Sequence, residues 1–247
     1  MHRQSICATL TYSPESLPEF GSLVRKHQSA FIKALRQAVA RRGGAPFSFD
    51  CCGEYSPLPL MRPHYHLALF GYEPLDGEPW AKSGAGNQEF VSAELTKAWS
   101  RGMVTYQPWS YGAAQYCAGH QAWKLTGDLA HARLAVIGPD GQAVAHRAPE
   151  FHQPSTRPGI GRRFFERYGE QALALGFTVA SDKPVPVPKY YLRRGDIDMP
   201  ELAATAREAR RLQAVKAASA LAPGRLDAIE VCAEPRIKRG GRGKGFV

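Results

Sequence analysis

The order of the periodic segments near the N-terminus is the feature that most constrains the fold of this chain. Residues 5–12, SICATLTY, alternate in polarity and carry β-branched side chains, as strands do. Between Pro18 and Gly43, apolar residues recur every three or four positions, which predicts a long amphipathic helix. Residues 46–55 and 63–72 are strand-like again, on either side of a turn-rich SPLPLMR. The order strand, helix, strand, strand favours an α+β domain with helices packed on an antiparallel sheet.

The remaining segments extend this pattern. A short helix is expected at 92–100 with Ser92 as its N-cap, followed by a strand at 102–107 and a helix from about Ser110 to Lys124. Residues 127–158 have little periodicity beyond a hairpin with its turn at Pro139-Asp140-Gly141. GRRFFERYGEQALAL and ELAATAREARRLQAVKAA are helical, with the Pro-rich KPVPVPKYYLRRG between them. We therefore expect a core at 1–127, an insertion at 128–158, a helical part packed on the core at 159–235, and a basic disordered tail at 236–247.

Charge and cysteine content narrow the classes of protein. The formal net charge of +10 points to a polyanionic partner, although basicity alone does not separate DNA from RNA or from an anionic membrane surface. The five cysteines form an odd set with no CxxC pair, which suits reduced thiols. No apolar run approaches the roughly 18 residues of a membrane span, and the first residues do not resemble a signal peptide. We expect a cytosolic protein with no membrane contact.

Two histidines in the strand-like segment 63–72 form a candidate metal grip. Side chains alternate between the faces of a strand, so His64 and His66 project from one face and Tyr65 from the other. If the preceding strand pairs with this one in antiparallel fashion, Glu54 can complete a divalent metal site. Taken alone, an HxH triplet is more often a pair of ordinary surface histidines.

Several segments of the chain resemble, in order, the replication initiators of gokushovirus-like microviruses, which are HUH-type rolling-circle endonucleases. His64-Tyr65-His66 resembles the HUH motif, which consists of two histidines around a bulky apolar residue. The segments that are similar to the family's motifs are CATLTYSPESLP, CCGEYSPLPLMRPHYHLALFGY, EFHQPSTRPGIGRRFFERYG and VPKYYLRR. They cover most of residues 5–195.

The resemblance implies an RRM-like antiparallel sheet that binds Mg²⁺ or Mn²⁺ through Glu54, His64 and His66. It also implies that a tyrosine nicks single-stranded DNA at a phage origin, which leaves the enzyme on the 5′ phosphate and frees a 3′ hydroxyl. The expected setting is the cytoplasm of a bacterial host, with host replication proteins as further partners.

The nucleophile implied by the resemblance lies in AAQYCAGHQAWK, which is similar to a family segment with two tyrosines. Tyr116 falls on the first tyrosine, His120 on the second, and Lys124 on one of two lysines. His120 shares a helix face with Tyr116 and can be a phosphate contact, a hydrogen-bond partner on the metal side, a proton acceptor or a surface histidine. We therefore predict catalysis with one tyrosine per active site.

Basic residues outside the metal grip are the candidate DNA contacts. They are Arg62 and, around the Arg157-Pro158-Gly159-Ile160-Gly161 loop, Arg157, Arg162 and Arg163. A helix that starts after this loop can cradle a phosphate with its N-terminal amides, or it can be a plain glycine-turn helix start. The cationic tail at 236–247 either holds DNA or is only solvated.

Two other functions stay open at this stage. A relaxase or transposase would share the metal and the tyrosine but act on a different DNA substrate. A non-catalytic basic protein would bind nucleic acid with a steep salt dependence and form no covalent product.

Overall fold

The computed structural model describes residues 4–84, 86–122, 127–180 and 182–218, together with short pieces at 224–225, 227–228 and 231–232. The chain divides into two compact units, one formed by residues up to Ile160 and the other by residues from Gly161 onward. The expected tail at 236–247 lies outside the described residues.

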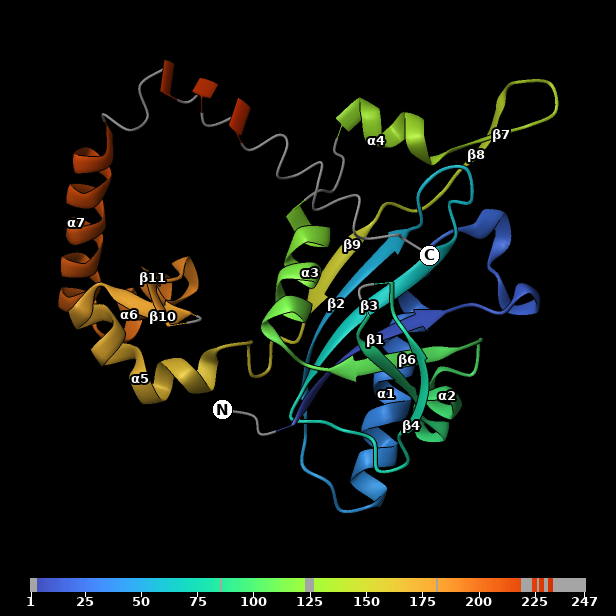
Figure 1. Cartoon of the computed structure of the whole chain (residues 1–247), viewed down its shortest axis with the longest axis horizontal. Helices are drawn as coiled ribbons and strands as arrows, with labels where there is room; N and C mark the ends of the chain where they lie inside the picture. Colours follow the sequence, from blue (N-terminus) through green and yellow to red (C-terminus); the bar gives the residue numbers. More distant parts are fainter. Residues whose placement is uncertain are drawn as a thin grey trace. The chain divides into compact units, whose positions relative to one another are not determined.

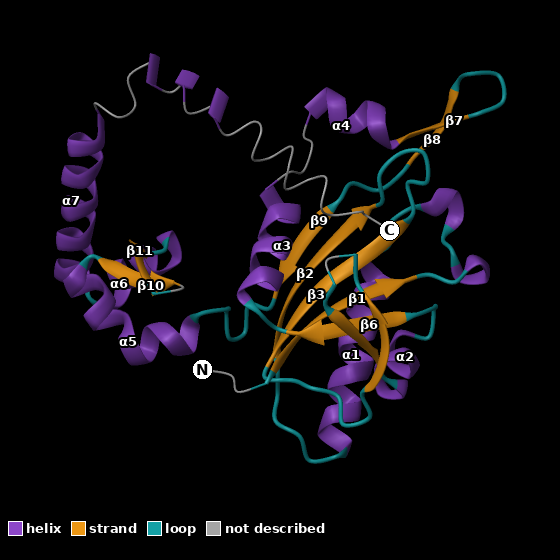
Figure 2. Cartoon of the chain, viewed as in Figure 1, coloured by secondary structure: helices purple, strands orange, loops and turns teal. Residues whose placement is uncertain are grey.

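The first unit is built around one sheet, in which each neighbouring pair of strands is antiparallel (Figure 2). Its strands are β1 (Ser5–Thr11), β2 (Ser48–Tyr55), β3 (Pro63–Phe70), β4 (Glu78–Lys82), β5 (Gln88–Val91), β6 (Val104–Pro108) and β9 (Phe151–Pro154). Their order across the sheet is β4-β5-β6-β1-β3-β2-β9. The three strands predicted first therefore lie side by side, with β3 in the middle.

Helices cover this sheet (Figure 1). They are α1 (Arg25–Arg41), α2 (Ala93–Trp99), α3 (Tyr111–Ala122) and α4 (Gly127–Leu134), and short 3-10 turns occupy Pro14–Ser16 and Glu19–Gly21. The hairpin predicted around Pro139-Asp140-Gly141 is formed by β7 (Ala135–Ile137) and β8 (Ala143–His146). The α+β class and the antiparallel sheet with packed helices are confirmed.

The two faces of the sheet differ in what they carry. Ile6, Ala8 and Leu10 of β1 point into the main hydrophobic core, which also contains Phe31 and Leu35 of α1. Trp99, the last residue of α2, is fully buried in the same core. Because neighbouring residues alternate, the intervening positions of β1, β2 and β3 lie on the opposite face.

The sequence placed the start of α1 too early. The helix expected from Pro18 begins only at Arg25, because Phe20 and Gly21 have positive φ angles of 56° and 61° that end a 3-10 turn. Leu23 is buried in the core from an extended segment instead. Ser92, in contrast, is the predicted N-cap of α2, and its hydroxyl accepts a hydrogen bond from the Leu95 backbone N–H.

A chain of buried hydroxyl groups joins the middle of β3 to the start of α1. The Tyr65 hydroxyl donates to the Val24 carbonyl at 3.0 Å and accepts from the Val24 N–H at 3.1 Å. The Tyr12 hydroxyl lies 2.8 Å from this hydroxyl and 2.8 Å from Nδ1 of His27. Burial and the nearby Arg101 charge lower the pKa of His27, so a neutral imidazole ends the chain. These bonds fasten β3 to α1 on the core face.

Two segments of the first unit were not predicted as regular structure. The loop expected to run through Gly86 contains the β4–β5 hairpin, and residues 128–158 contribute both α4 and β9. β9 pairs with β2 as an edge strand of the main sheet.

The second unit contains α5 (Arg162–Leu175), α6 (Lys189–Asp198) and α7 (Pro200–Ala217), with a hairpin of β10 (Phe177–Ala180) and β11 (Lys183–Pro186). Its small core includes Phe165, Leu173 and Leu192. This is the helical C-terminal extension that was predicted, with one unpredicted hairpin and α6 added. Among the described helices, none is both long and apolar enough to cross a membrane.

Candidate metal centre

Glu54, His64 and His66 meet on the face of the sheet opposite the main core. Glu54 lies directly across from His64 in the β2–β3 register, and His66 follows two residues later on the same face of β3. One potential ligand atom from each residue lies within 4.8 Å of those of the other two. Two imidazoles and a carboxylate are a donor set that suits a divalent ion. The prediction that these three residues come together is therefore confirmed.

Hydrogen bonds orient both imidazoles. Nδ1 of His64 lies 3.2 Å from the Arg62 carbonyl, which can only accept, so Nδ1 carries the proton and Nε2 keeps its lone pair. Nδ1 of His66 lies 3.1 Å from the hydroxyl of Thr9, its register partner on β1. Such contacts to the second nitrogen are typical of histidines that bind metals. The three residues fit a divalent ion by donor type and by support.

Helix α3 packs on this same face. Cys117 of α3 lies with its sulfur 3.7 Å from that of Cys7 on β1, and Ala113 and Trp109 complete a small buried cluster. The hydrogen bond to Cys7, burial, and the negative charges of Asp50 and Glu54 raise the pKa of the Cys117 thiol. The thiol is therefore a neutral packing group, and its coupling to Glu54 places this turn of α3 near the metal centre.

A carboxylate–imidazole pair borders the centre on its β9 side. Cys52 faces His66 on one neighbouring strand and His152 on the other, so His152 lies on the same face as the metal ligands. Nε2 of His152 bonds to a carboxylate oxygen of Asp50, two residues before Cys52 on β2. The His152 side chain is 37% exposed. The face thus offers a second polar group beside the three ligands.

The predicted catalytic residues are described only in part. Tyr116 and His120 belong to α3, but their side chains lie outside the described residues. Lys124 falls in 123–126, which is also outside them. Tyr111, the first residue of α3, is exposed.

The four predicted DNA contacts are all at least partly exposed. The Arg62 guanidinium donates to the Tyr12 carbonyl at 2.5 Å, at the end of β1. Arg157 follows β9 in the first unit. Arg162 and Arg163 begin α5 in the second unit, where Arg162 forms an ion pair with Glu166 at 2.6 Å.

Thr9, Asp50 and His152 were not predicted as site residues. Alternation in the first strand already placed Thr9 on a fixed face, but only the β1–β3 register shows that this is the histidine face. Asp50 and His152 are about one hundred residues apart, and the four residues of β9 have no periodicity that would reveal a strand.

Comparison with known proteins identifies similar chains. Residues 5–121 match the model of a family described as the replication-associated protein ORF2 family. This region contains the three metal-site residues and all but the last residue of α3. No solved structure matched the chain.

Two curated proteins are similar over most of the chain. Replication-associated protein VP4 of Bdellovibrio phage phiMH2K is 27% identical over 196 residues, which cover 77% of this chain and 58% of the phage protein. Replication-associated protein ORF2 of Spiroplasma virus 4 is 31% identical over 195 residues, which cover 75% of this chain and 56% of the viral protein. The chain therefore spans a little over half the length of these relatives.

Proposed function

Because this chain belongs, through residues 5–121, to the replication-associated protein ORF2 family, we propose that it is a phage replication initiator that nicks single-stranded DNA with a tyrosine nucleophile. The observation that carries this proposal is the meeting of Glu54, His64 and His66 on one face of the sheet. The names of both curated relatives refer to replication. The substrate we propose is the origin strand of a phage, in the cytoplasm of a bacterial host that supplies further replication proteins.

The three ligand residues are proposed to hold Mg²⁺ or Mn²⁺. A bound ion would polarise the scissile phosphate and offset its negative charge. Within the chain, Thr9 and the Arg62 carbonyl hold the two imidazoles in place for this task. Such support from a second layer of residues is typically needed for full metal affinity.

Tyr116 is the proposed nucleophile. Its phenolate oxygen forms a bond to phosphorus, the bond from phosphorus to the 3′ oxygen breaks, and that oxygen takes a proton to become the free 3′ hydroxyl. Positions 113, 116, 117 and 120 form one stripe of a helix, and Ala113 and Cys117 of that stripe contact the metal face of the sheet. This supports the choice of Tyr116 over Tyr111, which is exposed at the helix start.

Other groups are proposed to assist the reaction. His120 or Lys124 favours the phenolate, whose solution pKa is near 10, as a proton acceptor or as a nearby cation. Arg62, Arg157, Arg162 and Arg163 hold phosphates of the bound strand. With a single tyrosine, strand closure at the end of a round requires the regenerated Tyr116 or a second copy of the protein.

The test is a denaturing gel of the protein after incubation with single-stranded origin DNA and Mn²⁺. The wild-type protein should form a covalent adduct, and Tyr116→Phe should form none, because this change removes only the hydroxyl. Tyr111→Phe is the matched control and should keep the adduct. His64→Ala should abolish the adduct while DNA binding persists.

Three results would contradict the proposal. An adduct with the Tyr116→Phe protein, or a phosphodiester mapped to Tyr111 by mass spectrometry, would reject Tyr116 as the nucleophile. DNA binding with a steep salt dependence and no adduct under any divalent metal would favour a non-catalytic binding protein. Cleavage of a conjugative or transposon hairpin, but not of a phage origin strand, would favour a relaxase or transposase.

A further inference from the structure

Helix α1 carries an unusual distribution of charge. Arg25, Lys26, Lys33, Arg36 and Arg41 are its charged residues, all of them exposed, and the helix contains no Asp or Glu. Two of these cations stand in the first turn, where the helix dipole disfavours positive charge by roughly 0.3–1 kcal/mol each. Stability alone would place carboxylates there. The sequence of α1 therefore favours a role for this positive surface.

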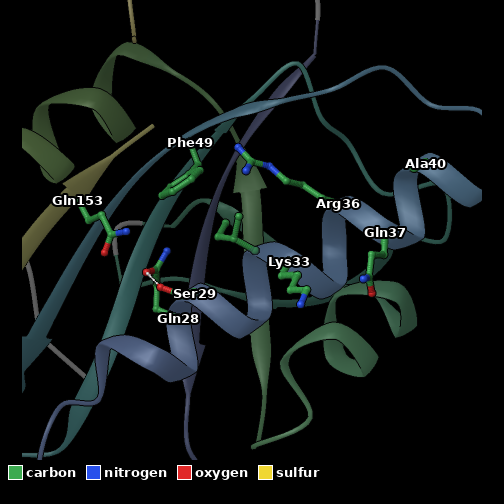
Figure 3. A pocket seen from close by; sticks show the side chains of 9 residues that line it. Gln28, Ser29, Lys33, Arg36, Gln37, Ala40, Phe49 and Gln153 are labelled. Atoms are coloured by element: carbon green, nitrogen blue, oxygen red, sulfur yellow. Dashed lines mark hydrogen bonds between the residues drawn. The ribbon is translucent and has the colours of Figure 1, made fainter. Parts of the chain in front are cut away.

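A groove runs between α1 and the β2–β9 edge of the sheet. Its volume is about 430 Å³, which is within the range of small-ligand sites. Figure 3 shows Phe49 of β2 and Gln153 of β9 reaching from the sheet toward side chains of α1. Phe49 and Gln153 alternate with Asp50 and His152, so the groove lies on the face opposite the metal centre.

The side chains around the groove supply positive charge and donors. Lys33 and Arg36 form no ion pair in the part of the chain that the structure describes. The Arg36 guanidinium lies 5.6 Å from the centre of the Phe49 ring, a contact that leaves its N–H edges for an anion. At one end of the same helix, Arg25 lies 4.4 Å above the Phe151 ring.

Gln28 provides a second, independent observation. Its side chain is fully buried at the groove, and its Oε1 accepts a hydrogen bond from the Ser29 hydroxyl at 3.5 Å. Its Nε2 has no hydrogen-bond partner among the described residues. A buried donor without a partner is costly, so an oxygen acceptor seated in the groove would be stabilised there.

We propose that this groove is a second binding track for single-stranded DNA, and that it holds the sugar–phosphate backbone on the face of the sheet opposite Glu54, His64 and His66. Lys33 and Arg36 contact phosphate oxygens, and Gln28 donates to an oxygen at the floor of the groove. From Arg25 to Arg36 the helix rises about 16 Å, so the cations follow a chain rather than a point. A positive groove beside aromatic side chains is typical of proteins that hold single strands.

The experiment compares two double variants of the full chain. The groove variant is Lys33→Ala/Arg36→Ala, and the control is Lys82→Ala/Lys97→Ala, which removes the same charge from exposed positions on β4 and α2. Fluorescence anisotropy with a labelled oligothymidylate is measured at several salt concentrations. The groove variant should bind roughly tenfold more weakly and lower the slope of log K against log salt by about 1.4, or about 0.7 for each lost phosphate contact. The control should change both by much less.

A further variant tests Gln28 separately from charge. Gln28→Met keeps the size of the side chain and removes its polar atoms, so the protein should be no less thermally stable but should bind the oligonucleotide more weakly. A wild-type affinity and salt slope in the groove variant would overturn the proposal. Tight binding of dATP that is lost in the groove variant, with unchanged oligonucleotide affinity, would instead assign the groove to free nucleotides and would also overturn it.

Nicking is measured in parallel, so that this inference and the proposed function fail separately. At saturating DNA, the groove variant should form the covalent adduct as the wild-type protein does, because its changes lie on the opposite face from the metal. Absence of an adduct in the wild-type protein would reject nicking and leave the binding result intact. A groove variant that binds normally would reject the track and leave nicking intact.

Discussion

Replacing Tyr65 with phenylalanine removes one hydroxyl at the junction between β3 and α1. The ring is fully buried and packs 5.6 Å from the Trp99 ring and 6.1 Å from the Phe151 ring, contacts that phenylalanine preserves. The change therefore isolates the hydrogen bonds. The Val24 carbonyl keeps a second donor, the His27 N–H at 3.0 Å, but the Val24 N–H loses its only described acceptor.

The expected cost follows from this count. One orphaned, partly buried N–H costs about 1–3 kcal/mol, and loss of the bond from Tyr12 adds roughly 1 kcal/mol. Tyr65→Phe should therefore lower the free energy of unfolding by about 2–4 kcal/mol, measured by urea denaturation with circular dichroism. Tyr12→Phe should cost less, because His27 can change tautomer and avoid an unsatisfied ring nitrogen. A loss below about 0.5 kcal/mol for Tyr65→Phe, at an unchanged m-value, would refute this reasoning.

Three further predictions concern stability, pH and metal binding. Gly53→Ala should destabilise the protein by about 1–3 kcal/mol in thermal unfolding, because an added Cβ would overlap the Phe151 ring. Stability should fall as pH is lowered through about 6.5, the ordinary histidine pKa, because the unfolded chain protonates His27 more readily than the folded chain; His27→Gln should reduce this slope between about pH 7 and 5. Thr9→Val should weaken Mn²⁺ binding roughly 10–100-fold in a calorimetric titration, whereas His66→Ala should abolish it.

Each of these has a result that would count against it. Gly119→Ala is the control for Gly53→Ala, because nothing lies within 4 Å of the position that its Cβ would occupy. Equal losses at both glycines would show that the overlap is not the cause. An unchanged pH slope in the His27 variant would assign acid sensitivity to other groups. Wild-type Mn²⁺ affinity in the Thr9 variant would show that the hydroxyl does not support His66.

Local patterns predicted the centre of the fold well. Alternation identified β1 and β3, and the cap preference of serine located the start of α2 at Ser92. The start of α1 failed because Phe20 continues the apolar period but adopts a positive φ, which periodicity does not register. β9 failed because its four residues become a strand only by pairing with β2, about one hundred residues away along the chain.

The candidate site divides in the same way. His64, His66 and Glu54 were predictable because two of them share one strand and the third needed only antiparallel pairing with the neighbouring strand. Asp50 and His152 form their pair through a tertiary contact that the sequence does not signal. The roles of Tyr116, His120 and Lys124 remain predictions, because they rest on the resemblance and on helical spacing.

The alternation of His64, Tyr65 and His66 ties the chemistry of β3 to its pairing register. A slip of one residue against β1 and β2 would turn the two imidazoles into the apolar core and expose the Tyr65 hydroxyl. Such a molecule would lose its hydroxyl chain and its ligand set in a single error. Partly correct sites should therefore be rare, and the fraction of a preparation that binds metal should equal the fraction with native strand pairing.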